Sequence, residues 1–351
     1  MDPRFKKISI SKEVSIQEAL KLMDKSSVRL LLVFCEDKFV SLLSIGDIQR
    51  AIIANFDLGS PIKNILRKEV VVANVEEDVG KLKKRMLFNR YEFMPIIDLE
   101  NNLADVIFWD DLFEDTDRRI EKIDLPVIIM AGGKGTRMKP ITNVLPKPLI
   151  PIDDKTIIEH IINNFTKIGC LSFYVSINYK AKMIRDYFDE IDKNYGIDFF
   201  EEDTPLGTAG SLHLLNGKIK SPFFISNCDI LINEDYSEIY KYHQNYKNEL
   251  TIVGSFRNYP IPYGTLETEE EGRLISLQEK PELSFLINSG MYILEPHLIA
   301  EVPENTFYHI TDLIEKILAR NGRVGVFPVS EKSWIDVGEW DKYLKMINEY
   351  K

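Results

Sequence analysis

Residues 127 to 152 read VIIMAGGKGTRMKPITNVLPKPLIPI. The apolar run at 127–130 predicts a short buried strand. Residues 131–137 then bring three glycines, a threonine and two cations. Backbone N–H groups beside glycine can approach an anion closely, because no side chain intervenes. We therefore predict a loop that cradles phosphate oxygens where the strand ends. The predicted nucleotide-binding residues of this loop are Ala131, Gly132, Gly133, Gly135 and Thr136.

Two further cations belong to this stretch. Arg137 closes the glycine loop, and Lys147 stands between two prolines that stiffen the backbone on either side. The order of residues excludes a P-loop, which needs Gly, four residues and then Gly-Lys-Ser/Thr. The dinucleotide fingerprint is excluded as well, because Met138 stands where its third glycine belongs.

Composition narrows the class of protein. A length of 351 residues predicts two domains, and 44% apolar residues suffice for packed cores. The net charge is −11 without a long Lys/Arg run, which argues against a nucleic-acid partner. No apolar run approaches the ~20 residues of a membrane span, and the N-terminus lacks the apolar core of a signal peptide. Three dispersed cysteines fit a reducing cytoplasm, and no Cys/His group has zinc spacing.

Strands and helices are expected to alternate after the glycine loop. Thr156 and Glu159 form a capping box before a helix that ends at Gly169. A strand at 173–177, a helix at 181–192 and a strand at 197–200 follow. This alternation predicts a mostly parallel sheet wrapped by helices, with ligands beyond the carboxyl ends of the strands.

Two acidic segments follow strands in this pattern. Residues 201–210 read EEDTPLGTAG, and Asp229 ends the apolar run that starts at 223. A carboxylate at a strand end is a natural ligand for Mg²⁺, which prefers oxygen. Cys228 has no evident base partner and is not expected to be a nucleophile. The five histidines, residues 160, 213, 243, 297 and 309, are scattered and are expected to be structural.

The glycine-rich GTR loop, the PKP segment and PLGTAG, in this order, resemble the sugar-1-phosphate nucleotidylyltransferases. The resemblance implies a Rossmann-like, GT-A-like α/β domain over 125–351. In that family a Gln or Glu before a PxG segment reads the nucleobase, a position that Glu202 occupies. A carboxylate only accepts hydrogen bonds, which suits the adjacent N1–H and N2 amino donors of guanine and favours GTP. Gly207 and Thr208 complete the predicted nucleotide-binding set.

The same resemblance assigns the remaining site. Asp229 and Asp336, the latter within WIDVG at 334–338, are implied as Mg²⁺ ligands. Arg137 and Lys147 are implied as the catalytic cations, at the α-phosphate and the sugar phosphate respectively. The YG, EKP and NSG segments are implied to line a sugar pocket. Its predicted residues are Gly264, Glu279, Lys280 and Asn288.

Residues 1–118 contain a weak internal repeat, with 27–48 paralleled by 91–112. Each copy reads as strand, turn, strand and an Asp that opens a helix. This resembles a tandem CBS pair, which implies an adenine or guanine nucleotide between the repeats and a dimer. Ser44 and Asp47 match the family's ribose-binding positions, but the second copy has Phe108 in place of Ser or Thr before Asp111. Simple helix capping is the other interpretation of both aspartates. We expect a regulatory or oligomerising module without a tightly bound nucleotide, joined to the enzyme domain by a charged linker at 114–124.

A CBS pair in front of PLGTAG resembles the guanylyltransferases that activate glucosamine 1-phosphate for legionaminic acid synthesis. Three alternatives stay open. One is a GDP-, UDP- or dTDP-sugar synthase for another hexose 1-phosphate, such as mannose or N-acetylglucosamine 1-phosphate. Another is a non-catalytic, nucleotide-sensing CBS protein. The third, a GT-A glycosyltransferase, needs a DxD motif at a strand end, and the chain's DxD at 115–117 lies in the charged linker.

Overall fold

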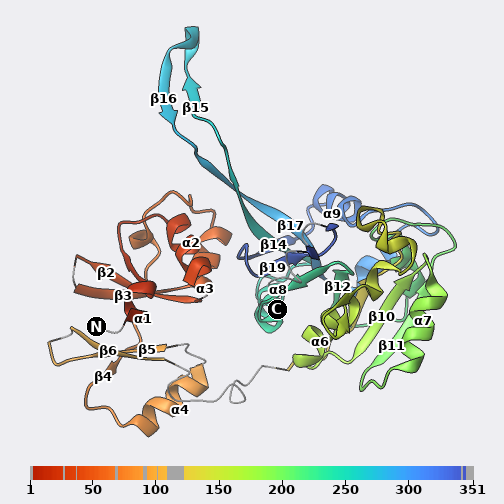
Figure 1. The fold of residues 1–351 in the computed structure, drawn as a ribbon, viewed down its shortest axis with the longest axis horizontal. Coiled ribbons are helices and arrows are strands. Elements are labelled where there is room, and N and C mark those ends of the chain that lie inside the picture. Colours follow the sequence, from red (N-terminus) through yellow and green to blue (C-terminus); the bar gives the residue numbers. More distant parts are fainter. Residues whose placement is uncertain are drawn as a thin grey trace. The chain divides into compact units, whose positions relative to one another are not determined.

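The computed structural model describes residues 3–26, 28–36, 38–67, 70–89, 93–100, 102–108, 122–340 and 343–344. The chain divides into two compact units, residues 1–120 and 121–351 (Figure 1). Most of the predicted linker at 114–124 lies outside the described residues. Among the described helices, none has both the length and the apolar character needed to cross a membrane.

The N-terminal unit holds two three-stranded sheets of the same design. In each, the second strand pairs in parallel with the first and antiparallel with the third. This shared order agrees with the predicted repeat. The sheets are β1 (Ser9–Ser11), β2 (Leu30–Cys35) and β3 (Lys38–Ser44), then β4 (Ala73–Asn74), β5 (Phe93–Ile97) and β6 (Leu103–Phe108). The helices are α1 (Pro3–Ile8), α2 (Ile16–Ser26), α3 (Ile45–Ile53), the 3-10 turn η1 (Ile62–Asn64) and α4 (Val79–Asn89).

The C-terminal unit is built on a seven-stranded sheet in the order β11-β10-β7-β12-β17-β14-β18. Only β17 runs antiparallel to its neighbours, so the sheet is mostly parallel, as predicted. Its strands are β7 (Val127–Met130), β10 (Ser172–Ile177), β11 (Gly196–Glu201), β12 (Phe223–Asn227), β14 (Leu250–Pro260), β17 (Glu282–Leu294) and β18 (Val324–Val329). The helices are α6 (Ile157–Lys167), α7 (Ala181–Glu190), α8 (Tyr236–Asn245) and α9 (Ile310–Ala319).

Shorter elements complete this unit. Among the described residues of this unit, three pairs of short strands lie outside the large sheet. They are β8 (Pro151–Ile152) with β9 (Lys155–Thr156), β13 (Ile230–Ile232) with β19 (Trp334–Asp336), and β15 (Thr265–Thr268) with β16 (Leu274–Gln278). The 3-10 helices are η3 (Thr136–Met138), η4 (Ile141–Asn143), η5 (Lys147–Leu149), η6 (Gly210–Leu215), η7 (Glu270–Gly272) and η8 (Pro296–Glu301).

The core explains why the central strand is apolar throughout. Val127 and Ile129 of β7 pack into the cluster that includes α6, α7 and α8, while Ile128 packs into the opposite cluster with η6 and α9. All three side chains are fully buried. A strand covered by helices on both faces reads as a continuous apolar run, which is the pattern at residues 127–130.

Helix ends follow the predicted caps. Thr156 and Glu159 form the expected capping box of α6, and Gly169 follows this helix at φ 99°. In the N-terminal unit, the Glu18 N–H donates to Ser15 Oγ (3.1 Å), and the Ser15 N–H donates to Glu18 Oε2 (2.9 Å). These reciprocal bonds satisfy backbone donors that the first helical turn leaves unpaired.

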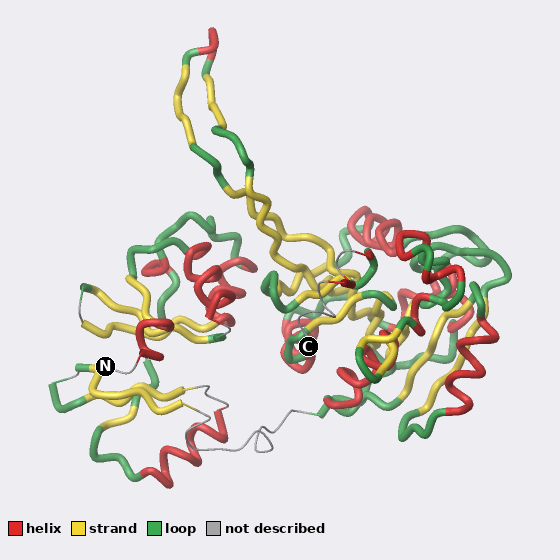
Figure 2. Tube along the Cα trace, in the orientation of Figure 1, coloured by secondary structure: helices red, strands yellow, loops and turns green. Residues whose placement is uncertain are grey.

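A long ribbon leaves the sheet. β14 and β17 pair as far as Pro260 and Glu282, and β15 and β16 continue the ribbon to its tip (Figure 1). Figure 2 shows strand in the inner and outer parts of this arm, with loop segments between them. Its outer apolar side chains are each more than half exposed: Leu266, Leu274, Ile275 and Leu277.

Candidate active site

The carboxyl ends of the parallel strands meet at one edge of the sheet. Met130, at the end of β7, is in register with Ser176 of β10 and with Asn227 of β12. The glycine loop therefore emerges beside the segment that carries Asp229. The residues that follow β11 start at the same edge, because β10 and β11 are also parallel. This is the position that the strand pattern predicts for a ligand site.

A cavity of about 390 Å³ opens at this edge. It collects most of the predicted nucleotide-binding and catalytic residues from four separate segments. Its predicted lining residues are Gly132, Gly133, Gly135, Thr136, Arg137, Lys147, Glu202, Gly207, Thr208 and Asp229. Ala131 does not line the cavity; it is buried, and its N–H donates to Ser176 O (3.0 Å).

Glycine is required at one position of the loop for packing. Gly135 has φ 61°, and a Cβ there would lie 2.9 Å from Thr142 Cγ2 and 3.1 Å from Lys147 Cβ. Thr142 Oγ1 in turn donates to the Gly135 carbonyl (3.0 Å). A Cβ at Gly133 would meet nothing within 4 Å. The loop thus folds tightly onto the Lys147 segment and leaves backbone open toward the cavity.

Glu202 is buried, and its carboxylate is held in place by two donors. Ser176 Oγ donates to Oε1 (2.6 Å), and the Leu206 N–H donates to Oε2 (2.9 Å). The Asn178 side chain also donates to the Glu202 carbonyl (2.6 Å). Each carboxylate oxygen has a second lone pair for a further donor. The arrangement therefore fixes an acceptor-only group in the wall of the cavity.

The PLGTAG loop packs against residues 306–309, for which the sequence predicts no binding role. Gly207 has φ 84°, and a Cβ there would lie 2.7 Å from the Tyr308 carbonyl. The same carbonyl accepts the N–H groups of Ala209 and Gly210, both at 3.0 Å. Gly207 thus permits the close approach of this backbone. The neighbours of Tyr308, Phe307 and His309, line the cavity. The sequence predicts a structural role for His309, because only its contact with a distant loop reveals its position at the cavity.

Asp229 and Asp336 come together although 107 positions separate them in the sequence. β13 pairs antiparallel with β19, with Ile230 opposite Asp336, and the Val337 N–H donates to the Asp229 carbonyl (2.9 Å). A Cβ at Gly338 would lie 2.7 Å from Asp229 Oδ2 and 2.8 Å from Asp336 Oδ1. Two carboxylate oxygens therefore converge on the space that glycine leaves open. Such a donor set fits Mg²⁺.

Lys147 joins this pair of aspartates. Its side chain is 9% exposed and forms an ion pair with Asp229 Oδ2. Its Nζ would lie 3.0 Å from a Cβ at Gly338. The ammonium therefore borders the same open space as the two carboxylates. Removing one partner of a buried pair leaves an uncompensated charge. We infer that Lys147 balances the acidic pair in this structure.

Arg137 lies on the rim. Its side chain is 63% exposed, and its Nη1 lies 3.4 Å from Glu339 Oε1. An exposed ion pair of this length contributes little free energy. It therefore does not hold the guanidinium away from a phosphate. Arg137 also lines a second cavity of about 250 Å³, which shares Asn227 and Asp229 with the first. The other residues of the second cavity are Ile230, Asn288, Ser289, Gly290, Tyr292, Trp334 and Asp336.

Of the four predicted sugar-binding residues, the structure places only Asn288 in this second cavity. Gly264, Glu279 and Lys280 lie on the arm and line neither of the two cavities. A Cβ at Gly264 would lie 2.9 Å from Glu279 Oε2, so these two residues are neighbours. The reason for their distance from Asn288 is the β14–β17 ribbon, which continues to Pro260 before the chain reaches them.

Residues 126–351 match the family described as Nucleotidyl transferase, and residues 3–54 match the CBS domain. The chain belongs to the nucleotidyl transferase family. The first match covers the whole of the cavity-bearing sheet. The CBS match covers the first of the two N-terminal repeats.

Named relatives agree with this assignment. The chain is 30% identical over 234 residues to the mannose-1-phosphate guanylyltransferase catalytic subunit beta of Dictyostelium discoideum. It is 28% identical over 235 residues to a probable mannose-1-phosphate guanylyltransferase of Oryza sativa subsp. japonica. Both alignments cover 64% of this chain and 64% of the relative, so the chain spans less than two thirds of the length of these curated relatives.

Solved structures show the same fold. HddC from Yersinia pseudotuberculosis is 28% identical, with a TM-score of 0.50, and the match covers 65% of this chain and all of HddC. A second HddC structure, complexed with GMP-PN, is 27% identical at the same TM-score. A putative glucose-1-phosphate thymidylyltransferase from Bacillus anthracis, 19% identical, shares the fold.

Cys228 lines the first cavity of this nucleotidyl transferase, yet its thiol is poorly suited to attack. Burial raises the pKa of Cys228 to about 12, with a further rise from the neighbouring Asp229 carboxylate. The thiolate is the reactive form of cysteine, and it would be scarce near neutral pH. The structure therefore favours the predicted packing role.

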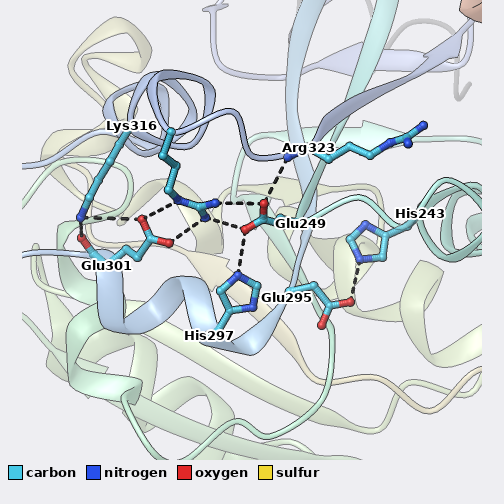
Figure 3. A network of polar contacts seen from close by, with 8 residues as sticks. His243, Glu249, Glu295, His297, Glu301, Lys316 and Arg323 are labelled. Carbon is cyan, nitrogen blue, oxygen red and sulfur yellow. Dashed lines mark hydrogen bonds and ion pairs between the residues drawn. The ribbon is translucent and has the colours of Figure 1, made fainter.

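A second group of potential metal ligands lies away from the cavities. The ligand atoms of Glu249, His297 and Glu301 all lie within 4.8 Å of one another (Figure 3). The Arg320 guanidinium donates to both carboxylates, at 3.0 Å to Glu249 Oε1 and 2.7 Å to Glu301 Oε1. Hydrogen bonds from Arg320 lower the pKa of Glu249 to about 2. An arginine thus already neutralises this acidic group.

In the CBS domain, the predicted ribose-binding pair is occupied by the chain itself. Ser44 caps α3, and Asp47 completes a capping box at its third position rather than opening the helix. Arg67 Nε donates to both Asp47 oxygens (2.8 and 2.9 Å), and its Nη2 donates to Ser44 Oγ (2.6 Å). Burial raises the pKa of Asp47, but hydrogen bonds from Arg67 and Ser44 outweigh it and hold the pKa below its usual value. In the second repeat, Asp111 lies outside the described residues, and Phe108 ends β6 beside Phe93.

Proposed function

We propose that residues 126–351 transfer a nucleotidyl group from GTP to a sugar 1-phosphate, giving a GDP-sugar and pyrophosphate. The observation that carries this proposal is the convergence of the glycine loop, Lys147, Asp229 and Asp336 at one sheet edge. The relatives named mannose-1-phosphate guanylyltransferase support both the reaction and the base. The free cysteines, residues 35, 170 and 228, support a reducing cytoplasm as its location.

The chemistry needs little covalent help. A sugar-phosphate oxygen attacks the α-phosphorus of the nucleotide, and a new P–O bond forms. The bond between the α-phosphorus and the bridging oxygen breaks, and pyrophosphate leaves with the electron pair. The attacking phosphate is already ionised, so no general base is required. Positioning of the substrates and neutralisation of their charge would therefore account for the rate acceleration.

The charged residues of the site divide this work. The backbone of 132–136 would hold the nucleotide phosphates, and Arg137 would neutralise charge that develops around the α-phosphate. Asp229 and Asp336 would hold Mg²⁺, which supplies charge neutralisation of the phosphates when bound. The Lys147 ammonium, displaced from Asp229 in that state, would pair with the sugar phosphate. Arg137 lines both cavities and would therefore lie where the two substrates meet.

We place the base at Glu202 and the sugar beside Asn288. The fixed, acceptor-only carboxylate of Glu202 suits guanine. Gly264, Glu279 and Lys280 would complete the sugar pocket if the arm folds toward the second cavity. Glucosamine 1-phosphate, toward legionaminic acid, is our favoured acceptor from the domain combination. Mannose 1-phosphate is the second candidate, favoured by the names of the relatives.

For residues 1–118 we propose a tandem CBS module that regulates or dimerises the enzyme. The match to 3–54 and the shared strand order of the two repeats support this proposal. The self-occupied Ser44 and Asp47 pair argues against a tightly bound nucleotide there. A purely nucleotide-sensing protein is the alternative of another class, and it predicts no turnover.

Pyrophosphate release with Mg²⁺ tests the proposed function. Four nucleoside triphosphates would be screened against glucosamine, N-acetylglucosamine, mannose and glucose 1-phosphates. We expect turnover with GTP and one of the first three sugars. Turnover with UTP or dTTP alone would keep the reaction and contradict the role of Glu202. If no pair of nucleotide and sugar phosphate gave turnover and GTP bound at the CBS module, the sensing alternative would be favoured.

A further inference from the structure

The segment at 306–309 forms a wall of the first cavity to which the proposed function assigns no role. Phe307 and His309 both line this cavity. The Phe307 side chain is 62% exposed. Its ring centroid lies 4.7 Å from that of His309, with an interplanar angle of 82°. Edge-to-face packing leaves much of the phenyl ring uncovered. An open aromatic ring beside a phosphate loop is a surface for a flat ligand.

This wall is fixed relative to the loop that carries Glu202. The Tyr308 N–H donates to the Leu206 carbonyl (2.9 Å), and the Leu206 N–H donates to Glu202 Oε2 (2.9 Å). The His309 N–H donates to Asp312 Oδ2 (2.7 Å), which anchors the far end of the segment to α9. The aromatic pair and the Glu202 carboxylate are thus linked through Leu206, by one backbone–backbone hydrogen bond and one backbone–side-chain hydrogen bond.

Thr208 contacts the imidazole ring of His309. Thr208 Oγ1 accepts the Ile310 N–H (3.1 Å) and lies 3.3 Å from His309 Nδ1. When the Thr208 hydroxyl is the donor in this contact, Nδ1 is the acceptor. Nδ1 is then unprotonated, and the proton of the neutral ring sits on Nε2. In this tautomer His309 brings a hydrogen-bond donor to a cavity in which Glu202 is an acceptor.

We propose that Phe307 and His309 determine the choice of nucleobase: Phe307 stacks against a purine, and His309 donates from Nε2 to its O6–N7 edge. This proposal rests on the proposed function of the cavity. Guanine presents acceptors at O6 and N7 and a donor edge at N1 and N2, which would match His309 and Glu202 together. Adenine presents an amino group in place of O6 and an acceptor at N1, so it would oppose donor to donor and acceptor to acceptor.

Steady-state kinetics with GTP, ITP and ATP test the proposal. Phe307→Ala is expected to raise KM for GTP and ITP roughly tenfold, as for loss of base stacking, with little change in kcat. Phe307→Tyr should restore the wild-type KM. Leu318→Ala is the matched control, because Leu318 is 54% exposed on α9 and does not line the cavity.

His309→Ala should lower the preference for GTP over ATP roughly tenfold. ITP keeps O6 and N7 but lacks the N2 amino group, so its KM should rise in this variant as much as that of GTP. A wild-type KM in Phe307→Ala overturns the stacking role, and an unchanged GTP/ATP ratio in His309→Ala overturns the donor role. If the wild-type protein turns over no nucleotide, the proposed function fails instead. Calorimetric titration with GTP then tests stacking separately: weaker binding to Phe307→Ala supports it, and equal binding overturns it.

Discussion

At the scale of single residues, the site depends on charges that are balanced before any substrate arrives. Lys147 pairs with Asp229, and Asp336 Oδ1 accepts the Gly338 N–H (2.8 Å). Because Asp229 has a buried cationic partner, its replacement would damage both stability and activity. Asp336 offers the cleaner test of the proposed metal site.

We expect Asp336→Asn to lower kcat at least roughly a hundredfold, since a neutral amide is a poor Mg²⁺ ligand. Excess Mg²⁺ should recover part of the lost rate. Asp153→Asn is the control: Asp153 is exposed in a turn at φ 51°, a conformation that asparagine also accepts. Wild-type turnover in Asp336→Asn, measured as pyrophosphate release, would refute its role.

At the scale of elements, the PLGTAG loop and the 306–309 segment form one packed unit. Gly207 and Gly217 both have positive φ, 84° and 78°, but only a Cβ at Gly207 would meet backbone. We expect Gly207→Ala to cost about 2–4 kcal/mol of unfolding free energy, from strain and crowding together. Gly217→Ala should cost only the strain, about 1–2 kcal/mol. Urea denaturation measures both, and equal losses would show that the contact with Tyr308 does not matter.

The ion pairs of Glu249 and Glu301 (Figure 3) join the residue before β14 to η8, and both carboxylates pair with Arg320, the residue that follows α9. The pKa of Glu249 is held at about 2, below its ordinary value of 4.5. The folded state therefore binds this proton less readily than the unfolded state. The stabilisation is fully present above pH 4.5 and is lost as pH falls toward 2.

Glu249→Gln should consequently lower the Tm by roughly 2–4 °C at pH 7. The difference from wild type should shrink as pH falls below 4.5, because the unfolded wild-type chain then binds a proton at Glu249 that the folded chain does not bind. Glu304→Gln, at an exposed position, should show neither effect. Thermal melts at pH 7, 5 and 3.5 measure this, and a difference that stays constant with pH would contradict the assigned pKa.

At the scale of the whole molecule, the N-terminal unit should respond weakly to adenine nucleotides. A ribose at Ser44 and Asp47 would have to displace Arg67 from both residues. We therefore expect AMP or ATP at about 1 mM to shift the Tm by less than roughly 1 °C, equivalent to a Kd near or above that concentration. A shift of several degrees would show that the Arg67 contacts open readily.

The sequence predicts those features of the fold and of the site that neighbouring residues determine. The strand at 127–130, the capping box of Thr156 and Glu159, and the glycine loop were predictable, because neighbouring residues determine them. The arm was not, because the sequence does not show where a long hairpin leaves its sheet. The wall formed by Phe307 and His309 was also missed. It becomes part of the site only through Gly207, 100 positions earlier in the chain.

The proposed reaction is tested most directly by measuring which product carries a labelled phosphate. GTP carrying ³²P at the α- or the γ-position would be incubated with Mg²⁺ and the sugar 1-phosphate that supports turnover. We predict that the α-label enters a sugar nucleotide and that the γ-label appears in pyrophosphate. A γ-label on the sugar, or an α-label released as GMP, would contradict attack of the sugar phosphate on the α-phosphorus.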